Sequence, residues 1–235
     1  MTNRSPLAKF RTVIGWKELA VCLTLCSLEP GLSWSANSRP GAFTTLDVPG
    51  AGTAPGEGTS PTTINPAGVI AGLYVDASSV AHGLLRDVDG TLTAFDVPGA
   101  GTASGQGTFI GGINPAGAIT GRYRDGDGVL HGYLRNRRGS FTAFDAPGAG
   151  TTSGQGTFAQ SINPAGMITG RYRDANGAAH GFLRERDGTV ITFDAPGAGT
   201  ASGQGTLVSS INPAGAITGN YVDAVGVSHG YLLSH

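Results

Sequence analysis

The sequence predicts an all-β fold, a four-bladed β-propeller of 49-residue repeats closed by an N-terminal strand. First, the run I-N-P-A-G occurs four times at a spacing of 49 residues, which indicates stacked supersecondary units. Second, each repeat holds four short strand-like stretches separated by tight-turn residues, with no helical period. Third, a spare copy of the fourth strand precedes the first repeat. The runs begin at Ile64, Ile113, Ile162 and Ile211.

Local patterns define the elements of one repeat, and the second repeat serves as the example. Asn114-Pro115-Ala116-Gly117 predicts a type I turn, because Asn can bond its own backbone, Pro presets φ and Gly suits the fourth position. The residues after this turn alternate between apolar and polar, as in a half-buried strand. Strands are expected over Thr108–Asn114, Ala118–Asp125, Val129–Arg135 and Phe141–Asp145.

The two ends of the repeat array favour a closed ring. Phe43–Asp47 (FTTLD) resembles the fourth strand of a repeat, whereas the last repeat ends after Leu233 without such a strand. We therefore expect Phe43–Asp47 to complete the last blade, which would hide two sheet edges. A β-solenoid is the alternative, although solenoid coils are usually shorter and do not need three hairpin turns.

Residues 1–38 differ in composition from the propeller domain expected over 39–235. Basic residues come first, an apolar run follows over residues 19–28, and small residues come next, which is the pattern of a secretory signal peptide. A short buried helix or a misassigned start codon is the alternative, and lipidation of Cys22 stays open. The leader predicts a secreted protein without membrane insertion once the leader is removed, because the apolar run is too short to span a bilayer.

Charge and cysteine content exclude several classes of function. Both cysteines, Cys22 and Cys26, lie in the leader, so the domain has no disulfide or thiol chemistry. From Phe43 onward there are 10 Arg and 14 Asp and Glu residues, a net charge of 10 − 14 = −4. Because no basic cluster occurs, nucleic acid is not an expected partner. A closed ring hides its edges, so we expect a monomer.

The chain resembles the HAF-repeat family of predicted extracellular bacterial proteins. The resemblance covers residues 43–235 and is carried by I-N-P-A-G-x-I-x-G-x-Y-x-D, then H-G-F/Y-L, then F-T-x-F-D-x-P-G-A. Gly follows each repeated histidine here, where the family name implies Ala, and the next residue is Phe only at Phe182. The resemblance implies export and a repeat architecture. It brings no established activity and therefore no catalytic residues.

One histidine per repeat is the most suggestive candidate for chemistry. Imidazole is a common metal ligand, so a shared metal is one interpretation. The expected strand order instead places each histidine on a third strand, away from the propeller axis, where the four cannot converge on one ion. We therefore expect each ring to tie its strand to a neighbouring strand or loop through both nitrogens, for instance to a repeated Asp. The four are His82, His131, His180 and His229.

Two glycine-rich motifs suggest ligand binding, but each has a simpler interpretation. Asp125-Gly126-Asp127-Gly128 has alternate carboxylates like a calcium loop, but its equivalents in the other three repeats lack the second carboxylate, which favours a plain turn. The loop at residues 99–107 suggests phosphate binding. However, Ser104 interrupts the G-x-G-x-x-G pattern, and neither a Lys nor a helix follows.

Repetition of every polar residue decides the functional prediction. Catalysis usually needs one asymmetric constellation, and none is visible, so we expect no catalytic, cofactor-binding or metal-binding residues. The prediction is a secreted, non-catalytic binding module for an extracellular glycan or protein, not an enzyme. The alternative is a secreted hydrolase or lyase with a site at the axial mouth, which asymmetry between blades would mark. Visible asymmetries are modest: Arg122 and Arg171 stand where other repeats have Leu73 and Asn220, and Glu57 where others have Gln.

Overall fold

The computed structural model describes residues 41–234, which are all-β and form four repeats of three or four strands. All fifteen strands belong to one compact unit that begins at Leu46. Within the described residues, no helix has the length and hydrophobicity needed to cross a membrane. The first strands of the repeats are β1 (Gly58–Ile64), β5 (Gly107–Ile113), β9 (Gly156–Ile162) and β13 (Gly205–Ile211). The second strands are β2 (Ile70–Val75), β6 (Ile119–Arg124), β10 (Ile168–Arg173) and β14 (Ile217–Val222). The third strands are β3 (Ala81–Arg86), β7 (Leu130–Arg135), β11 (Ala179–Arg184) and β15 (Ser228–Leu233). The fourth strands are β4 (Leu92–Phe95), β8 (Phe141–Phe144) and β12 (Val190–Phe193).

Each repeat is an antiparallel meander whose turns follow from its sequence. In the second repeat β5 pairs with β6, β6 with β7 and β7 with β8. The expected turn between β5 and β6 is confirmed, because the amide of Gly117 donates to the carbonyl of Asn114 at 3.0 Å. Gly117 has a φ of +81°, a conformation that side chains with a Cβ rarely adopt.

Neighbouring repeats stack through their broad faces, and the hydrophobic core lies between them. Ala71 of the first repeat packs with Ile110 and Tyr133 of the second, and corresponding clusters fill the next two junctions. The third strand of one repeat also meets the first strand of the next, where Leu130 and Gly156 form a parallel pair. Gly156 has a φ of +107° and the Leu130 backbone lies against its Cα, so this position requires glycine.

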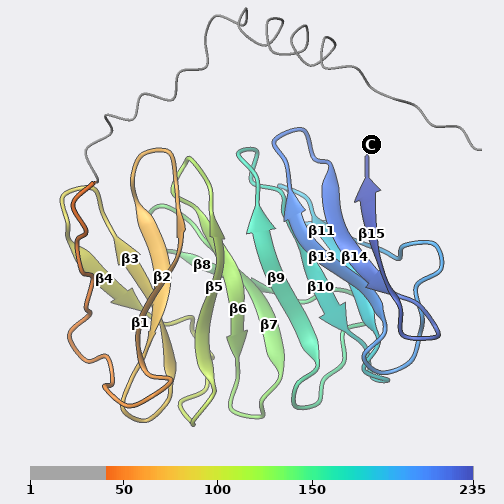
Figure 1. The fold of residues 1–235 in the computed structure, drawn as a ribbon, viewed down its shortest axis with the longest axis horizontal. Coiled ribbons are helices and arrows are strands. Elements are labelled where there is room, and N and C mark those ends of the chain that lie inside the picture. Colours follow the sequence, from red (N-terminus) through yellow and green to blue (C-terminus); the bar gives the residue numbers. More distant parts are fainter. Residues whose placement is uncertain (1–40, 235) are drawn as a thin grey trace, which may run out of the picture. The chain divides into compact units, whose positions relative to one another are not determined.

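The sheet is open, and the predicted closing strand is not formed. Its strand order runs from β1 to β15 without a pairing between these two, and Figure 1 shows the repeats in a row from the orange β1 to the blue β15. No strand is assigned to Phe43–Asp47, and Phe43 is fully exposed. The other fourth strands all pair with the third strand that precedes them in the chain. Within the described residues, no third strand precedes Phe43–Asp47, so this copy of the motif lacks the partner that the other fourth strands have.

Candidate functional site

The repeated histidines lie on the third strands, each between two carboxylates. In the second repeat, Nδ1 of His131 lies 3.0 Å from Oδ2 of Asp145, and Nε2 lies 3.2 Å from Oδ2 of Asp125. The ring of Tyr123 stacks on the imidazole with centroids 4.9 Å apart. Asp125 follows β6 and Asp145 follows β8, so the histidine ties three strands of its repeat together. The same arrangement surrounds His82 and His180, which confirms the expected pairing through both ring nitrogens.

The carboxylates favour the protonated imidazole. Burial lowers the pKa of His131, but the hydrogen bonds to Asp145 and Asp125 outweigh it, so the pKa is raised overall. For Asp125, burial raises the pKa, while the amide of Val129 and the imidazole lower it more, so its pKa is lowered overall. Each ring nitrogen of His131 thus has a carboxylate partner within 3.2 Å.

The fourth histidine, His229, has only one of the two carboxylate partners. Nε2 of His229 lies 3.1 Å from Asp223, but no carboxylate of the described residues reaches Nδ1, because the last repeat has no fourth strand. Its side chain is 42% exposed, compared with 23% for His131. Among residues 41–234, no group of three or more His, Cys, Asp or Glu side chains could hold a metal ion.

The carboxylate of Asp125 organises the turn that resembles a calcium loop. Its Oδ1 accepts the amides of Asp127 and Val129 at 3.0 and 2.8 Å, while Oδ2 faces His131. The backbone and the imidazole thus use the lone pairs that a calcium ion would need. This geometry agrees with the interpretation of the motif as a plain turn.

Each glycine-rich loop is fastened to turns of the two repeats that it connects. The amide of Gly154 donates to the carbonyl of Gly128 in the second repeat, and Nε2 of Gln155 donates to the carbonyl of Ala175 in the third, at 2.9 and 3.0 Å. Glu57 takes the glutamine position in the first loop and accepts the amide of Ala54 at 2.8 Å. A carboxylate has no N–H group, so Glu57 cannot donate to a turn carbonyl as Gln155 does. The contacts of Gly154 and Gln155 make their loop a structural bridge between the second and third repeats.

A shallow polar hollow of about 330 Å³ lies where the loops and turns of the third and fourth repeats meet. Ser153 and Gln155 line it from one loop, Arg173 and Asn176 from the turn after β10, and Ser202 from the next loop. Hydroxyl, amide and guanidinium groups therefore converge on one small surface. The loop and the turn recur at each junction between repeats, so closely similar surfaces recur along this edge of the array.

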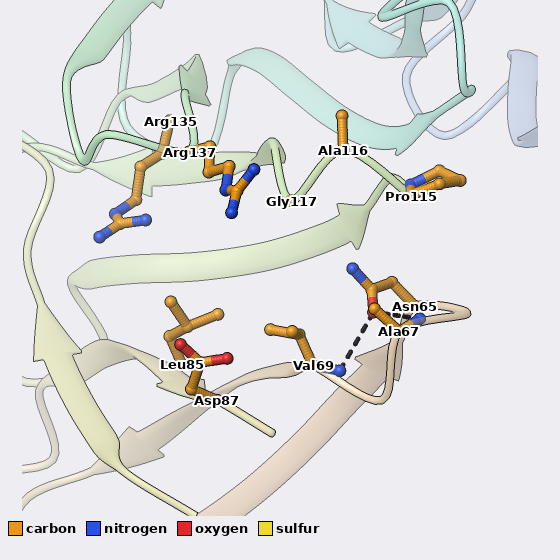
Figure 2. A pocket seen from close by; sticks show the side chains of 10 residues that line it. All are labelled: Asn65, Ala67, Val69, Leu85, Asp87, Pro115, Ala116, Gly117, Arg135 and Arg137. Atoms are coloured by element: carbon orange, nitrogen blue, oxygen red, sulfur yellow. Dashed lines mark hydrogen bonds between the residues drawn. The ribbon is translucent and has the colours of Figure 1, made fainter. Parts of the chain in front are cut away.

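A second hollow, of about 320 Å³, lies at the opposite edge between the first and second repeats. Figure 2 shows Arg135 and Arg137 of the second repeat on one side, with Asn65 and Asp87 of the first repeat on the other. Opposite charges thus line the two walls. The third repeat has Arg184 and Arg186 in the places of these two arginines, whereas the sequence of the last repeat has Leu233 and His235 there.

The asparagines of the I-N-P-A-G runs form a ladder across the repeats, which the sequence analysis did not predict. Nδ2 of Asn65 donates to the carbonyl of Asn114, Asn114 donates to Asn163, and Asn163 donates to Asn212, at 3.3, 3.4 and 3.3 Å. The Oδ1 atoms close the turns of their own repeats, as the amide of Ala118 shows at 2.9 Å from Asn114. The signal in the sequence is the spacing of 49 residues between identical asparagines.

The arginines that mark the asymmetry between repeats stack on phenylalanine rings. The guanidinium of Arg122 lies 5.1 Å from the Phe109 ring and 5.5 Å from the Phe158 ring of the next repeat. Arg171 lies 4.9 Å from the same Phe158 ring. Burial lowers the pKa of Arg122, and the nearby Arg171 adds to this effect. Arg122 therefore bridges the second and third repeats by cation–π contacts, whereas Arg171 stacks on a ring of its own repeat.

No family model matches the chain, and no curated protein matches it. The resemblance described under Sequence analysis therefore stays a prediction. The geometry of the repeats and of the surfaces between them is the basis of the proposed function.

Proposed function

We propose that the chain is a secreted, non-catalytic repeat protein that binds an extracellular glycan or protein through the edge formed by its glycine-rich loops. The observation that carries this proposal is the polar hollow around Arg173 and Asn176, whose lining has a counterpart with Ser104, Gln106 and Arg124 one repeat earlier. Weak sites repeated on a rigid array gain avidity when a ligand also repeats.

A glycan is the ligand class that the lining chemistry favours. Ser153, Gln155 and Ser202 present hydroxyl and amide groups, and Arg173 adds a donor group that stays charged at neutral pH. The hollow has few apolar side chains, unlike most small-molecule pockets. A polysaccharide presents hydroxyl groups at regular intervals, which suits a shallow, repeated, polar surface.

The alternative, a secreted hydrolase or lyase, has less support. The candidate acids and bases repeat from one unit to the next, and Asp125, His131 and Asp145 already satisfy each other by ion pairs. Catalysis would need one unit to differ in its reactive groups.

Export and membership of the HAF-repeat family belong to the same proposal. The leader at residues 1–38 lies outside the described residues, and the resemblance to the HAF-repeat family agrees with secretion. The closed four-bladed propeller is a competing prediction, because it requires Phe43–Asp47 to pair with β15 of the same chain, a pairing that the structure does not have.

A glycan array probed with the purified chain tests the proposal. Arg173→Ala and Asn176→Ala should reduce the signal on any bound glycan several-fold. Arg138→Ala is the matched control, because this exposed arginine lies in the turn after β7, at the opposite edge. A blank array, or equal losses for Arg173→Ala and Arg138→Ala, would contradict glycan binding by the loop edge.

A further inference from the structure

The three junctions between repeats are built from the same set of contacts. The amide of Leu130 donates to the carbonyl of Gln155 at 2.9 Å, and the first and third junctions have the same bond. The ring of Phe144 lies over Gly132, where an added Cβ would be 2.8 Å from it, and Phe95 and Phe193 cover the equivalent glycines. Each junction also contains one hydrogen bond of the asparagine ladder. The Asp that follows the fourth strand before each junction pairs with the histidine of the same repeat, as Asp145 pairs with His131.

The last repeat supplies only one of the two partners of each of these contacts. Within the described residues, Nδ1 of His229 has no carboxylate, Nδ2 of Asn212 meets no carbonyl, and the space over Gly230 is open. Apolar side chains are uncovered as well. Leu232 is 72% exposed, whereas the equivalent Leu183 of the third repeat is 3% exposed.

The first repeat presents the other half. Asp47 and Leu46 precede β1 as Asp96 and Phe95 precede β5, and both aspartates are exposed. Ile64 is 64% exposed, although its equivalents in the other repeats are between 7% and 8% exposed. The carbonyl of Asn65 stands where Asn114, Asn163 and Asn212 accept the ladder bond.

The segment that carries Asp47 is held on the first repeat in the same way as its internal equivalents. The amide of Val48 donates to Oγ1 of Thr59 at 3.0 Å, and that of Val97 donates to Thr108 at 3.1 Å. The amide of Gly52 donates to the carbonyl of Val75 at 2.9 Å, as in the second repeat. Asp47 is therefore placed as Asp96 is placed for His82, but the described residues supply no histidine to Asp47.

We propose that the chain associates head to tail with a second copy, in which Leu46 and Asp47 of one copy complete the last repeat of the other. Asp47 pairs with Nδ1 of His229, Leu46 covers Gly230, and the asparagine ladder continues from Asn212 to the Asn65 carbonyl of the second copy. The occupant is a copy of this chain because each missing group has its counterpart at a spacing of 49 residues. Such a contact is heterologous, so it generates rings or open filaments. The monomer expected from a closed ring is replaced by an assembly.

Disulfide trapping tests the contact directly. Gly83 and Phe95 are cross-strand partners, as are Gly132 and Phe144, so the corresponding residues Leu46 and Gly230 should come within disulfide reach. Leu46→Cys and Gly230→Cys are introduced with Cys22→Ser and Cys26→Ser, and the oxidised chain should give a ladder of covalent oligomers on a non-reducing gel. A mixture of the two single-cysteine chains should give a covalent dimer.

The matched control combines Leu46→Cys with Gly181→Cys. Gly181 occupies the same position on β11 but is already covered by Phe193, so no cross-link should form with Leu46→Cys. A fast-migrating monomer with an internal disulfide would overturn the proposal in favour of ring closure within one chain. Absence of any cross-link between positions 46 and 230 would overturn it as well.

Sedimentation of the unmodified chain gives a second measurement that needs no cysteine. The average mass should rise with concentration, and Asp47→Ala should weaken association by about tenfold or more. Asp96→Ala removes the same residue type from an internal pair, so it should leave association unchanged. A constant monomer mass, or equal effects of Asp47→Ala and Asp96→Ala on association, would contradict the head-to-tail contact. Binding on the glycan array is scored separately, so the two proposals can fail independently.

Discussion

Replacing Tyr133 by Phe should stabilise the protein, because the Tyr133 hydroxyl is buried without a partner. The side chain is 0% exposed, and its hydroxyl has no hydrogen-bond partner in the described part of the chain. Burial also raises the pKa of this phenol well above its usual range. The ring itself covers Gly121 and packs against Phe141, contacts that a phenylalanine would keep.

The size of the effect follows from the cost of burying an unpaired hydroxyl. That cost is about 1–3 kcal/mol in proteins, so Tyr133→Phe should raise the free energy of unfolding by about 1–2 kcal/mol. For a chain of this size, each kcal/mol corresponds to about 2–4 °C in melting temperature. Tyr231 has the equivalent place in the last repeat, where its side chain is only half-buried and burial raises its pKa to about 12. Tyr231→Phe should therefore give a smaller gain.

Thermal melting followed by circular dichroism measures the effect, and the chain offers its own reciprocal control. The third repeat has Phe182 in this position, also 0% exposed, so Phe182→Tyr should lower the melting temperature by a similar amount. The reasoning is refuted if Tyr133→Phe lowers the melting temperature, because the hydroxyl would then have a partner whose loss is costly.

Three further substitutions test the junctions and the ion pairs. His131→Gln should cost about 1 kcal/mol at pH 5.5 and less at pH 8.5. The pKa of His131 in the folded state is raised above 6.5. Its contribution to the free energy of unfolding is therefore complete below pH 6.5 and is lost as the pH rises through the folded-state pKa. Equal costs at both pH values would contradict this. Asn163→Ala should lower the free energy of unfolding by about 1–3 kcal/mol because it removes a ladder bond. Asn212→Ala should lower it by less, because no carbonyl of the described residues accepts the Asn212 side-chain amide. Urea titration of the two variants compares these costs. Gly132→Ala should lower the free energy of unfolding by about 1–3 kcal/mol, because the new Cβ meets the Phe144 ring. Gly230→Ala should be tolerated at low protein concentration, because the space over Gly230 is open. Equal melting temperatures of the two variants would show that the Phe144 ring moves aside freely.

Local chemistry made the elements of the repeat predictable. Strands were expected over Val129–Arg135 and Phe141–Asp145, and the structure has β7 at Leu130–Arg135 and β8 at Phe141–Phe144. The turn at Asn114 depends only on residues adjacent in the chain, so its sequence was sufficient. The pairing of histidine with aspartate was also accessible, because both residues recur at the same spacing.

Contacts between repeats could not be predicted from the sequence in the same way, because they depend on how the repeats stack. Phe43–Asp47 has the composition of a strand, but a strand forms only where a neighbouring strand supplies its hydrogen bonds, and the sequence does not say which neighbour is present. The asparagine ladder depends on the separation of successive turns, which is fixed by side chains packed between the repeats. The stacking of Arg122 on Phe158 is likewise a contact between repeats, so the sequence showed only that Arg122 was unusual.

The asparagine ladder gives the array a direction. Asn114 and Asn163 each donate a side-chain amide to the next repeat and accept at the backbone carbonyl from the previous one, so one residue contacts both neighbouring repeats. A unit of 49 residues copied into the gene in frame, wherever the copy begins, would arrive with a complete donor and a complete acceptor. The fold therefore tolerates growth and shortening by whole units, and the length of the array is open to evolutionary change without any redesign of its junctions.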